Sequence, residues 1–211
     1  MRILLTGSTG MLGSSIKDEL LRSNHELEIL VPTRFDLDLL DAKATESYLQ
    51  QHLPDLVIHC AAKVGGIQAN LNNPWEFFYS NLRLDLNLIS AAIDAKIKSF
   101  YYFGSSCMYP ALTEQPMHES KLLSGKLESS NEGYAIAKLT GTKLVEAAAI
   151  QFGLDWHVFI LSNLYGPKDN FDLESGHLVA AIINKIDAAL KTNKAAVDMW
   201  GDGRARREFT F

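Results

Sequence analysis

Gly7-Ser8-Thr9-Gly10-Met11-Leu12-Gly13 is the stretch of sequence that decides the fold. It directly follows the apolar run from Arg2 to Thr6 and opens a helical pattern from Met11 to Arg22. Glycines permit a tight turn and a close approach of the backbone to a pyrophosphate, whose charge the helix N-terminus stabilises. A glycine pattern alone is weak evidence, but strand, spacing and helix together predict a dinucleotide-binding turn. We therefore expect all seven residues, Gly7, Ser8, Thr9, Gly10, Met11, Leu12 and Gly13, to contact a cofactor.

Apolar runs recur along the chain with helical stretches between them, which is the pattern of crossover units on a parallel sheet. These runs are nearly continuous in apolar residues, as expected for strands that helices cover on both faces. Further strands are predicted at Leu27–Val31, Leu56–Cys60, Ser99–Phe103 and His157–Leu161. Helices are predicted at Ala42–His52 with Asp41 as N-cap, at Trp75–Lys96 after Asn73 and Pro74, and at Tyr134–Phe152. The fold class is α/β, a doubly wound parallel sheet of the Rossmann type.

The pattern changes after Leu161. A polar loop is expected at Pro110–Gly133, a helix at Leu178–Leu190 and a short strand at Val197–Trp200. The last five residues alternate like a strand and then stop. At roughly 150 residues per domain, 211 residues correspond to about one and a half domains. We expect a dinucleotide-binding domain at residues 1–161 and a partial, apparently truncated substrate-binding lobe at residues 162–211.

Composition excludes several classes of protein. The chain is 47% hydrophobic and 21% charged, which is typical of a globular protein rather than a disordered one. Its net charge of -5 argues against a nucleic acid partner. No apolar run approaches the ~20 residues of a membrane-spanning helix or forms a signal peptide, so a cytoplasmic location without membrane contact is expected. Cys60 and Cys107 lie apart, which predicts neither a disulfide nor a metal site.

The end of the second strand indicates which cofactor binds. In dinucleotide-binding folds the ribose is read about 20 residues beyond the glycines, by an acidic residue for NAD or by an arginine for NADP. Arg34 and Asp36 both occur in this region. Arg34 lies closer to the strand end, so we favour NADP(H). A solvated surface arginine is the alternative.

Tyr134 and Lys138 are four residues apart, so they share one face of the predicted helix. A nearby cation favours the phenolate and is expected to lower the pKa of the tyrosine, so that it can exchange a proton with a substrate oxygen. Ser105 lies at the end of the fourth strand, at the edge where ligands bind in open parallel sheets, and its hydroxyl could contact the same oxygen. Turn chemistry is the alternative role for this serine. The glycine turn, the serine and the Tyr-Lys pair are together far more specific than any one of them.

This arrangement resembles the extended short-chain dehydrogenase/reductases that act on nucleotide sugars. Three local motifs narrow the resemblance to the GDP-L-fucose synthase family. They are Ala61-Ala62-Lys63-Val64-Gly65-Gly66-Ile67, Gly104-Ser105-Ser106-Cys107-Met108-Tyr109-Pro110 and Asn163-Leu164-Tyr165-Gly166-Pro167. The resemblance covers essentially all 211 residues. It implies an NADP-dependent enzyme that epimerises C3 and C5 of GDP-4-keto-6-deoxy-mannose, reduces the C4 ketone and works as a homodimer.

The same resemblance implies a role for each matching residue. Reduction would use Ser105, Tyr134 and Lys138, while Cys107 and His177 would exchange protons at C3 and C5. The cofactor would contact Arg34, Ala61, Ala62, Lys138, Asn163, Leu164 and His177 in addition to the glycine turn. The GDP-sugar would contact Lys185, Trp200 and Arg207. Without the resemblance, Cys107 is more simply a small core residue and His177 a structural one.

Three departures from the family pattern affect these expectations. Gly133 stands where a proline commonly precedes the tyrosine, which loosens the backbone before the helix. Lys185 replaces an arginine and keeps its charge without the bidentate fork. The family also continues for about another hundred residues. We therefore expect the 211-residue chain to bind cofactor better than it turns over substrate. The alternatives are a relative acting on another 4-keto-deoxy sugar and a non-catalytic NADP-binding module.

Overall fold

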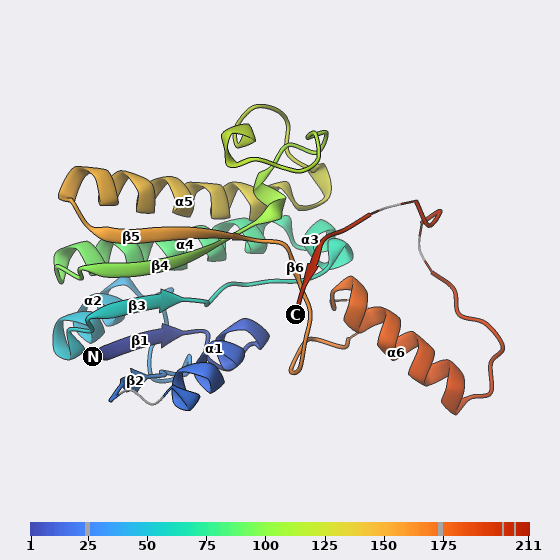
Figure 1. The fold of residues 1–211 in the computed structure, drawn as a ribbon, viewed down its shortest axis with the longest axis horizontal. Helices are drawn as coiled ribbons and strands as arrows, with labels where there is room; N and C mark the ends of the chain where they lie inside the picture. Colours follow the sequence, from blue (N-terminus) through green and yellow to red (C-terminus); the bar gives the residue numbers. More distant parts are fainter. Residues whose placement is uncertain (24–25, 173–174, 200, 205) are drawn as a thin grey trace.

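The computed structural model of the protein describes residues 1–23, 26–172, 175–199, 201–204 and 206–211. Its centre is a parallel sheet of five strands in the order β2-β1-β3-β4-β5 (Figure 1). The strands are β1 (Arg2–Thr6), β2 (Glu28–Leu30), β3 (Leu56–His59), β4 (Ser99–Ser105) and β5 (Asp155–Leu161). All five predicted strands are confirmed, with shifts of one or two residues at half of their ends.

Strand β1 is the point at which the order of the sheet reverses. Ile3 pairs with Ile29 of β2 on one side and with Leu56 of β3 on the other. In open α/β sheets, ligands bind outside the carboxyl ends of the strands at such a switch point. The turn that follows β1 and the loop that follows β3 meet there, so the topology brings the glycine turn and Ala61-Ala62 together.

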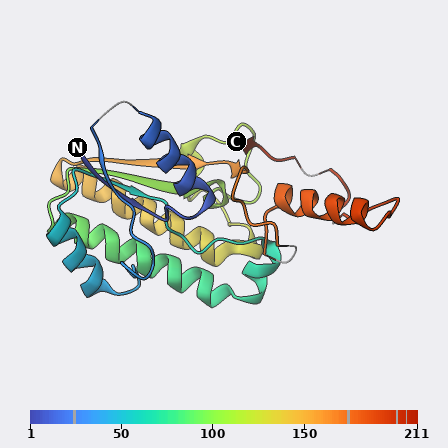
Figure 2. The same ribbon diagram turned by 90° about the horizontal axis from the view of Figure 1, so that it is seen from below.

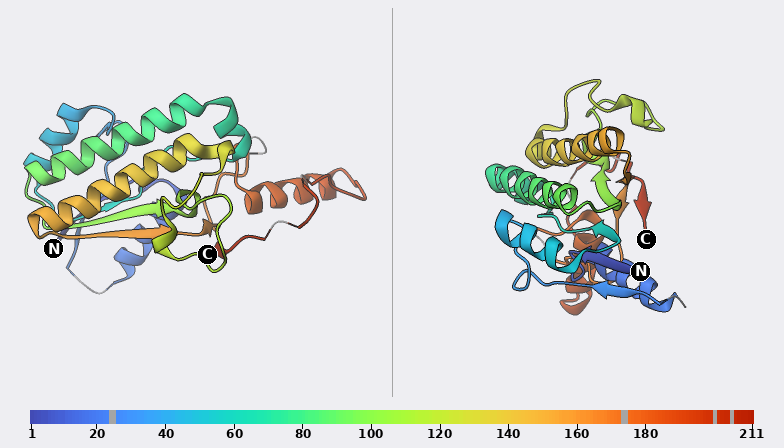
Figure 3. Two further views of the ribbon diagram at one scale, coloured as in Figure 1. Left: turned by 90° about the horizontal axis from the view of Figure 1, so that it is seen from above. Right: turned by 90° about the vertical axis from the view of Figure 1, so that its left-hand side faces the viewer.

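Helices cover the two faces of the sheet unequally. One face carries α2 (Ala42–His52), α4 (Pro74–Asp94) and α5 (Glu132–Phe152), and the other carries α1 (Met11–Arg22) (Figures 2 and 3). The larger core lies under the three helices and includes Leu88, Phe100 and Val145, which are all fully buried. The smaller core lies under α1 and is built on Ile3, Leu5, Leu56 and Ile58. Helix ends follow the sequence: the Asp41 side chain caps α2, and Pro74 is the first residue of α4.

The expectation that helices bury both faces of every strand is wrong for β5. Its side chains alternate between buried and exposed positions, and Phe159 is 43% exposed on the face opposite α5. β5 is the edge strand of the sheet. In the part of the chain that the structure describes, α1 is the only helix that packs on this face, and it lies over the strands at the other side of the sheet. Aromatic contacts between Phe159 and the rings of Tyr101 and Phe103 partly cover this face.

Residues 162–211 form a separate set of elements. A two-stranded parallel sheet joins β6 (Asn163–Leu164) to β7 (Phe209–Thr210), which confirms the strand-like pattern at the end of the chain. Helix α6 (Leu178–Lys191) projects away from the large sheet (Figure 1). The strand predicted at Val197–Trp200 is wrong for residues 197–199: they have no paired strand, and the Asp198 carbonyl accepts from the Lys185 ammonium at 2.8 Å. Trp200 lies outside the described residues.

Short elements occur in two segments where no helix or strand was predicted. A six-residue helix, α3 (Ile67–Asn72), follows the Gly65-Gly66 pair and was not predicted, because its amide-rich sequence has no helical apolar period. The loop after β4 contains the 3-10 turns η1 (Ser106–Met108), η2 (Glu119–Lys121) and η3 (Ser129–Asn131). Within the described residues, no helix is both long and apolar enough to cross a bilayer.

Candidate active site

The glycine turn after β1 is packed so closely that side chains cannot enter it. Gly7 has φ +67°, and a Cβ atom there would lie 2.6 Å from the Ala61 amide nitrogen. A Cβ at Gly13 would lie 2.2 Å from the Gly7 carbonyl oxygen. The backbone of β1, of the first turn of α1 and of the loop after β3 thus come together without intervening side chains. This is the cradle that a pyrophosphate needs if it is to reach backbone amides.

Helix α1 begins in a way that favours an anion. Gly10 occupies the N-cap position and provides no side-chain hydrogen bond to the first turn. The first turn contains no acidic side chain, and the Gly10 amide donates to the Gly7 carbonyl at 3.1 Å. The remaining amides of the first turn and the positive end of the helix dipole are therefore available to a phosphate group. These residues fit a dinucleotide.

The loop after β3 is held in place by buried polar side chains. The Ala61 amide donates to Thr6 Oγ1 at 3.3 Å. Asn81, fully buried on α4, accepts from the Lys63 amide at 2.8 Å and donates to the Lys63 carbonyl at 2.9 Å. These bonds fix Ala61 and Ala62 next to Gly7. Asn81 was not predicted, although a polar residue on the apolar face of α4 is a recognisable signal in the sequence.

The two side chains that could read the adenosine ribose differ in their surroundings. The Asp36 carboxylate accepts from the Thr33 amide at 2.8 Å and from the Thr33 hydroxyl at 2.7 Å, and these two bonds lower its pKa. Arg34 has an exposed side chain whose nearest acidic partner is Asp38, at 3.8 Å. Asp36 is thus engaged in its own turn, whereas the Arg34 guanidinium extends into solvent where a phosphate could reach it.

Ser105 and Cys107 lie in one turn at the carboxyl end of β4. Ser105 ends the strand, and its Oγ accepts from the Cys107 amide at 3.3 Å. A Cβ at Gly104 would lie 2.6 Å from Met108 Cε, so glycine lets the turn fold back over the strand end. The Cys107 sulfur accepts from the Asn131 side-chain amide at 3.0 Å. The serine and the thiol therefore face the start of α5.

Tyr134 lies in the first turn of α5, close to this turn. Burial, the neighbouring Cys107 and Asp85 raise the pKa of Tyr134 above its ordinary value of 10.0, and a hydrogen bond with Ser105 opposes them. The expectation that Lys138 lowers this pKa is therefore wrong. The physical reason is that burial destabilises the charged phenolate more strongly than the hydrogen bond with Ser105 stabilises it. Tyr134 is set up as a proton donor at neutral pH.

Lys138 follows one turn later on α5 and points into the core. It is 3% exposed, and its ammonium lies 3.8 Å from Asp85 Oδ2 and 4.1 Å from the centre of the Tyr102 ring. Asp85 also accepts from the Tyr102 hydroxyl at 2.5 Å. Asp85 and Tyr102 were not predicted as part of the site. An acid among Asn81, Leu84 and Leu88, on the buried stripe of α4, was the available signal.

His177 lies at the N-cap of α6, and a close backbone contact ties its segment to the loop after β3. The Gly66 amide donates to the Ser175 carbonyl at 2.9 Å, and a Cβ at Gly66 would lie 2.7 Å from the Gly176 carbonyl oxygen. The His177 ring is 3.8 Å from the Asp169 carboxylate. The segment that leads to His177 therefore contacts the loop after β3, at the carboxyl edge of the sheet. His177 and Cys107 lie on different elements.

The remaining predicted contacts lie in residues 162–211. Asn163 of β6 donates from its side chain to the Glu208 carbonyl at 3.0 Å, and Leu164 pairs with Thr210 of β7. Lys185 contacts the Asp198 carbonyl, while Arg207 donates to the Arg206 carbonyl at 3.0 Å. The described structure thus gives Lys185 and Arg207 local partners and adds nothing on Trp200, which is outside it.

Two buried oxygen atoms have no hydrogen-bond partner in the part of the chain that the structure describes. They are Asn131 Oδ1 and Asn70 Oδ1. Their elements, η3 and α3, pack against each other. Buried polar atoms are almost always hydrogen-bonded, so two unpaired acceptors, one of them on the asparagine that contacts Cys107, favour a ligand that carries hydroxyl groups. Neither asparagine was predicted from the sequence.

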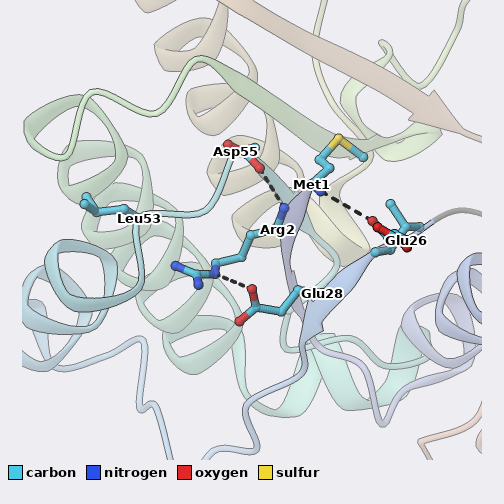
Figure 4. A pocket seen from close by; sticks show the side chains of 7 residues that line it. Met1, Arg2, Glu26, Glu28, Leu53 and Asp55 are labelled. Atoms are coloured by element: carbon cyan, nitrogen blue, oxygen red, sulfur yellow. Dashed lines mark hydrogen bonds and ion pairs between the residues drawn. The ribbon is translucent and has the colours of Figure 1, made fainter.

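A shallow hollow at the opposite edge of the sheet serves structure rather than chemistry. It is lined by Met1, Arg2, Glu26, Leu27, Glu28, Leu53 and Asp55, at the amino ends of the strands (Figure 4). The Arg2 amide donates to Asp55 at 2.7 Å and the Arg2 guanidinium to Glu28 at 2.9 Å. These bonds tie β1 to β2 and β3, on the edge where open α/β sheets do not bind ligands.

Comparison with known proteins agrees with this geometry. The model of the NAD dependent epimerase/dehydratase family matches residues 3–211. The chain belongs to this family. As a family member it is 43% identical over 212 residues to GDP-L-colitose synthase of Yersinia pseudotuberculosis, covering 100% of this chain and 68% of that protein. It is 42% identical to GDP-L-fucose synthase of Azorhizobium caulinodans, covering 100% of this chain and 67% of that protein.

A solved structure extends the likeness to the fold. The GDP-L-fucose synthetase of Naegleria fowleri, bound to NADP, matches with a TM-score of 0.86 at 30% identity. That match covers 99% of this chain and 68% of the solved one. The epimerase/dehydratase chain described here therefore spans about two thirds of the length of these relatives, and its fold agrees with the predicted Rossmann type.

Proposed function

We propose that the full-length protein is an NADP-dependent epimerase-reductase that converts GDP-4-keto-6-deoxy-D-mannose to GDP-L-fucose. The observation that carries this proposal is the grouping of Ser105, Cys107 and Tyr134 at the carboxyl end of β4. A phenol, a hydroxyl and a thiol together suit proton exchange beside a ketone. The relatives named for fucose and colitose synthesis support the choice of sugar.

The glycine turn, the start of α1 and the loop at Ala61-Ala62 would hold the cofactor. Arg34 would bind the 2′-phosphate, which makes NADP(H) the cofactor rather than NAD, and the NADP-bound relative supports this. Lys138 would hold the nicotinamide ribose, and Asn163, Leu164 and His177 would lie near the nicotinamide. When bound, NADPH supplies the hydride that reduces the C4 carbon.

Tyr134 and Ser105 would complete the reduction. As the C4 ketone becomes an alkoxide, its oxygen needs a proton and a hydrogen bond. Tyr134 keeps its phenolic proton at neutral pH because burial raises its pKa, so it can donate that proton to the oxygen. The Ser105 hydroxyl, which is in contact with Tyr134, would hold the same oxygen in place.

Cys107 and His177 would carry the epimerisation. At C3 and C5, a base removes the proton next to the ketone, the C4 oxygen takes up the electrons as an enolate, and an acid returns a proton to the opposite face. Two groups on opposite sides of the sugar ring are needed. Cys107 on η1 and His177 at the start of α6 come from different elements, as such an arrangement requires.

The domains, partners and location are proposed on the same basis. Residues 1–161 would form the NADP-binding domain, and residues 162–211 would begin the substrate lobe, where Lys185, Trp200 and Arg207 contact the GDP-sugar. The helices α4 and α5 would pair in a homodimer, which the exposed Trp75, Tyr79 and Leu86 of α4 support. We place the enzyme in the cytoplasm. Light scattering of the full-length protein tests the dimer.

The decisive experiment incubates the full-length protein with NADPH and GDP-4-keto-6-deoxy-mannose in D₂O. We expect NADPH oxidation, a GDP-L-fucose product, and deuterium at both C3 and C5. Deuterium uptake without NADPH oxidation would contradict the reductase role, and oxidation without uptake at either carbon would contradict the epimerase role. If neither occurs while NADPH still binds, the protein is a non-catalytic NADP-binding module.

A second candidate substrate follows from the 43% identity to GDP-L-colitose synthase. The protein would then be a related epimerase-reductase that acts on another 4-keto-deoxy sugar. Lys185, which stands where an arginine is expected, is the residue most directly open to such a difference, since a lysine cannot make the bidentate contact of an arginine. Competition between the two sugar nucleotides for one sample of enzyme distinguishes these candidates by their kcat/KM values.

A further inference from the structure

A cluster of polar side chains lies within the apolar core beneath α4 and α5, with Asp85 at its centre. Asp85 is 1% exposed, and each of its oxygens has a partner. His59 Nε2 is 2.9 Å from Oδ1, and the Tyr102 hydroxyl donates to Oδ2 at 2.5 Å. The Lys138 ammonium lies 3.8 Å from Oδ2. The carboxylate thus joins β3, β4 and α5 to α4.

The hydrogen bonds continue from Asp85 to the loop proposed to hold the cofactor. An ionised carboxylate only accepts, so His59 Nε2 donates to Asp85 and His59 Nδ1 is an acceptor. Thr6 Oγ1 donates to that Nδ1 at 2.7 Å and accepts from the Ala61 amide at 3.3 Å. Lys138 and Ala61 are therefore linked through the side chains of Asp85, His59 and Thr6.

The cluster contains one pair of opposite charges. Burial would raise the pKa of Asp85, but Lys138, His59 and Tyr102 together outweigh it and lower the pKa. Burial lowers the pKa of His59, which is therefore neutral, and raises the pKa of Tyr102. For Lys138, burial lowers the pKa and Asp85 is the strongest opposing influence. The ammonium thus depends on Asp85 for its charge.

We propose that Asp85 is a positioning residue of the active site: its carboxylate is the counter-ion that holds the buried Lys138 in its charged form, ready to donate to the nicotinamide ribose. This inference rests on the proposed role of Lys138 in cofactor binding. A charged ammonium offers three donors and no acceptor, which suits the two ribose hydroxyls. A buried lysine without a counter-ion loses its proton instead.

Few other groups could replace Asp85 in this role. The titratable groups that face Lys138 or Asp85 are His59 and Cys60 from the end of β3, Tyr102 from β4, and Tyr134 from α5. Burial raises the pKa of the Cys60 thiol to about 12, against the influence of Lys138. His59, Cys60 and both tyrosines are thus neutral at physiological pH. Among the described residues, Asp85 is the anion that faces Lys138.

The test measures the affinity of the full-length protein for NADPH between about pH 6 and pH 9, by the change in NADPH fluorescence on binding. Asp85→Asn keeps the shape and removes the charge. Since Lys138 then loses its proton at a lower pH, we expect affinity close to that of the unaltered protein at about pH 6 and at least roughly tenfold weaker affinity at about pH 9. The unaltered protein should show a much flatter profile.

Two further variants separate positioning from general damage to the core. Asn87→Leu removes another buried polar side chain of α4, which donates to the Leu39 carbonyl at 2.8 Å and is not part of the cluster. It should lower stability without creating pH-dependent affinity. In a Lys138→Met background, Asp85→Asn should cause no further loss of affinity, because Asp85 acts through Lys138.

The outcomes are distinct. Asp85→Asn with unchanged affinity, or with a loss that does not vary with pH, overturns the role of Asp85, as does an added loss in the Lys138→Met background. If Asp85→Asn alone does not fold, the proposal requires that Asp85→Asn/Lys138→Met does fold, since it removes both charges. If neither folds, the role is refuted in favour of a purely structural one. Absence of NADPH binding by the unaltered protein would instead refute the proposed function.

Discussion

Replacing Gly13 by alanine tests the cradle for the pyrophosphate most directly. The new Cβ would lie 2.2 Å from the Gly7 carbonyl oxygen and 2.7 Å from the Gly7 carbonyl carbon. Gly7 has little room to retreat, because the backbone of Ala61 lies so close that a Cβ on Gly7 would be 2.6 Å from the Ala61 amide nitrogen. To restore a contact of about 3.0 Å, the turn must open by about 0.8 Å in a region packed as densely as the rest of the interior.

Both stability and affinity should fall in Gly13→Ala. Overpacking costs about 1–3 kcal/mol, of which the better helix propensity of alanine offsets up to about 1 kcal/mol. These two contributions allow a net loss of about 0–3 kcal/mol, and we expect the free energy of unfolding to drop by about 1–2 kcal/mol, the middle of that range. Losing one hydrogen bond to a charged phosphate costs about 1.5–3 kcal/mol, which weakens NADPH binding roughly 10- to 150-fold.

Urea denaturation and NADPH titration of the same samples measure the two effects. Gly10→Ala is the matched control for stability: Gly10 has an extended backbone at φ -77°, and a Cβ there meets its nearest atom at 3.5 Å. Alanine is a weaker N-cap than glycine, so the free energy of unfolding of Gly10→Ala should fall by about 0.5 kcal/mol, less than in Gly13→Ala. The reasoning is refuted if Gly13→Ala unfolds at the same urea concentration as the unaltered protein and binds NADPH within about twofold of it.

Three further perturbations test other parts of the site. Arg34→Ala should weaken NADPH binding at least roughly tenfold and leave NADH binding unchanged, since only NADPH carries the 2′-phosphate; equal losses for both cofactors would contradict this. Gly141→Ala should destabilise the protein by about 2–5 kcal/mol, although alanine has the better helix propensity. Its Cβ would lie 2.2 Å from the Tyr102 hydroxyl and would break the hydrogen bond from that hydroxyl to Asp85. A melting temperature equal to or above that of the unaltered protein would refute this. Burial raises the pKa of Tyr134 above 10.0, and a proton donor works below its pKa. The reduction rate should therefore show no loss from tyrosine ionisation below about pH 10. A fall in rate nearer neutral pH that depends on Tyr134 would contradict this.

The sequence predicts the sheet and the glycine turn well because both depend on local patterns. An apolar run, a glycine at a fixed distance and a helical period specify β1, the turn and α1 within the first 22 residues. The order of the strands follows from chain connectivity, so the meeting of the Gly7 turn and the Ala61 loop is also predictable. Arg34, Ser105, Tyr134 and Lys138 were found as candidates in the same way.

What the sequence does not predict depends on contacts between distant segments. Lys138 was expected to act on Tyr134, which is near it in the chain, whereas its partner is Asp85, 53 positions away on another helix. The Asn131 contact with Cys107 joins η3 to η1, which are 24 positions apart in the loop after β4. Asn131 also occupies the N-cap position of α5, but its side chain makes no capping hydrogen bond. The usual preference for asparagine as a capping residue would therefore assign this side chain the wrong role. A strand at residues 197–199 fails for the same reason: a short apolar run becomes a strand only where a neighbour pairs with it.

The position of Asp85 means that the two halves of the proposed site are not independent. Thr6 and His59 belong to the strands that carry the cofactor turn and loop, and Lys138 belongs to the helix that carries Tyr134. The carboxylate of Asp85 bonds to His59 and faces Lys138. Gly141 leaves room for this carboxylate, because a Cβ at position 141 would lie 2.9 Å from it. Substitutions in either half must then alter the other through Asp85, and their free energies should not add. A chemical reason favours such coupling in the proposed reaction, because a ketone is reduced only when the nicotinamide, carried by its ribose, and the phenol are aligned with it at the same moment.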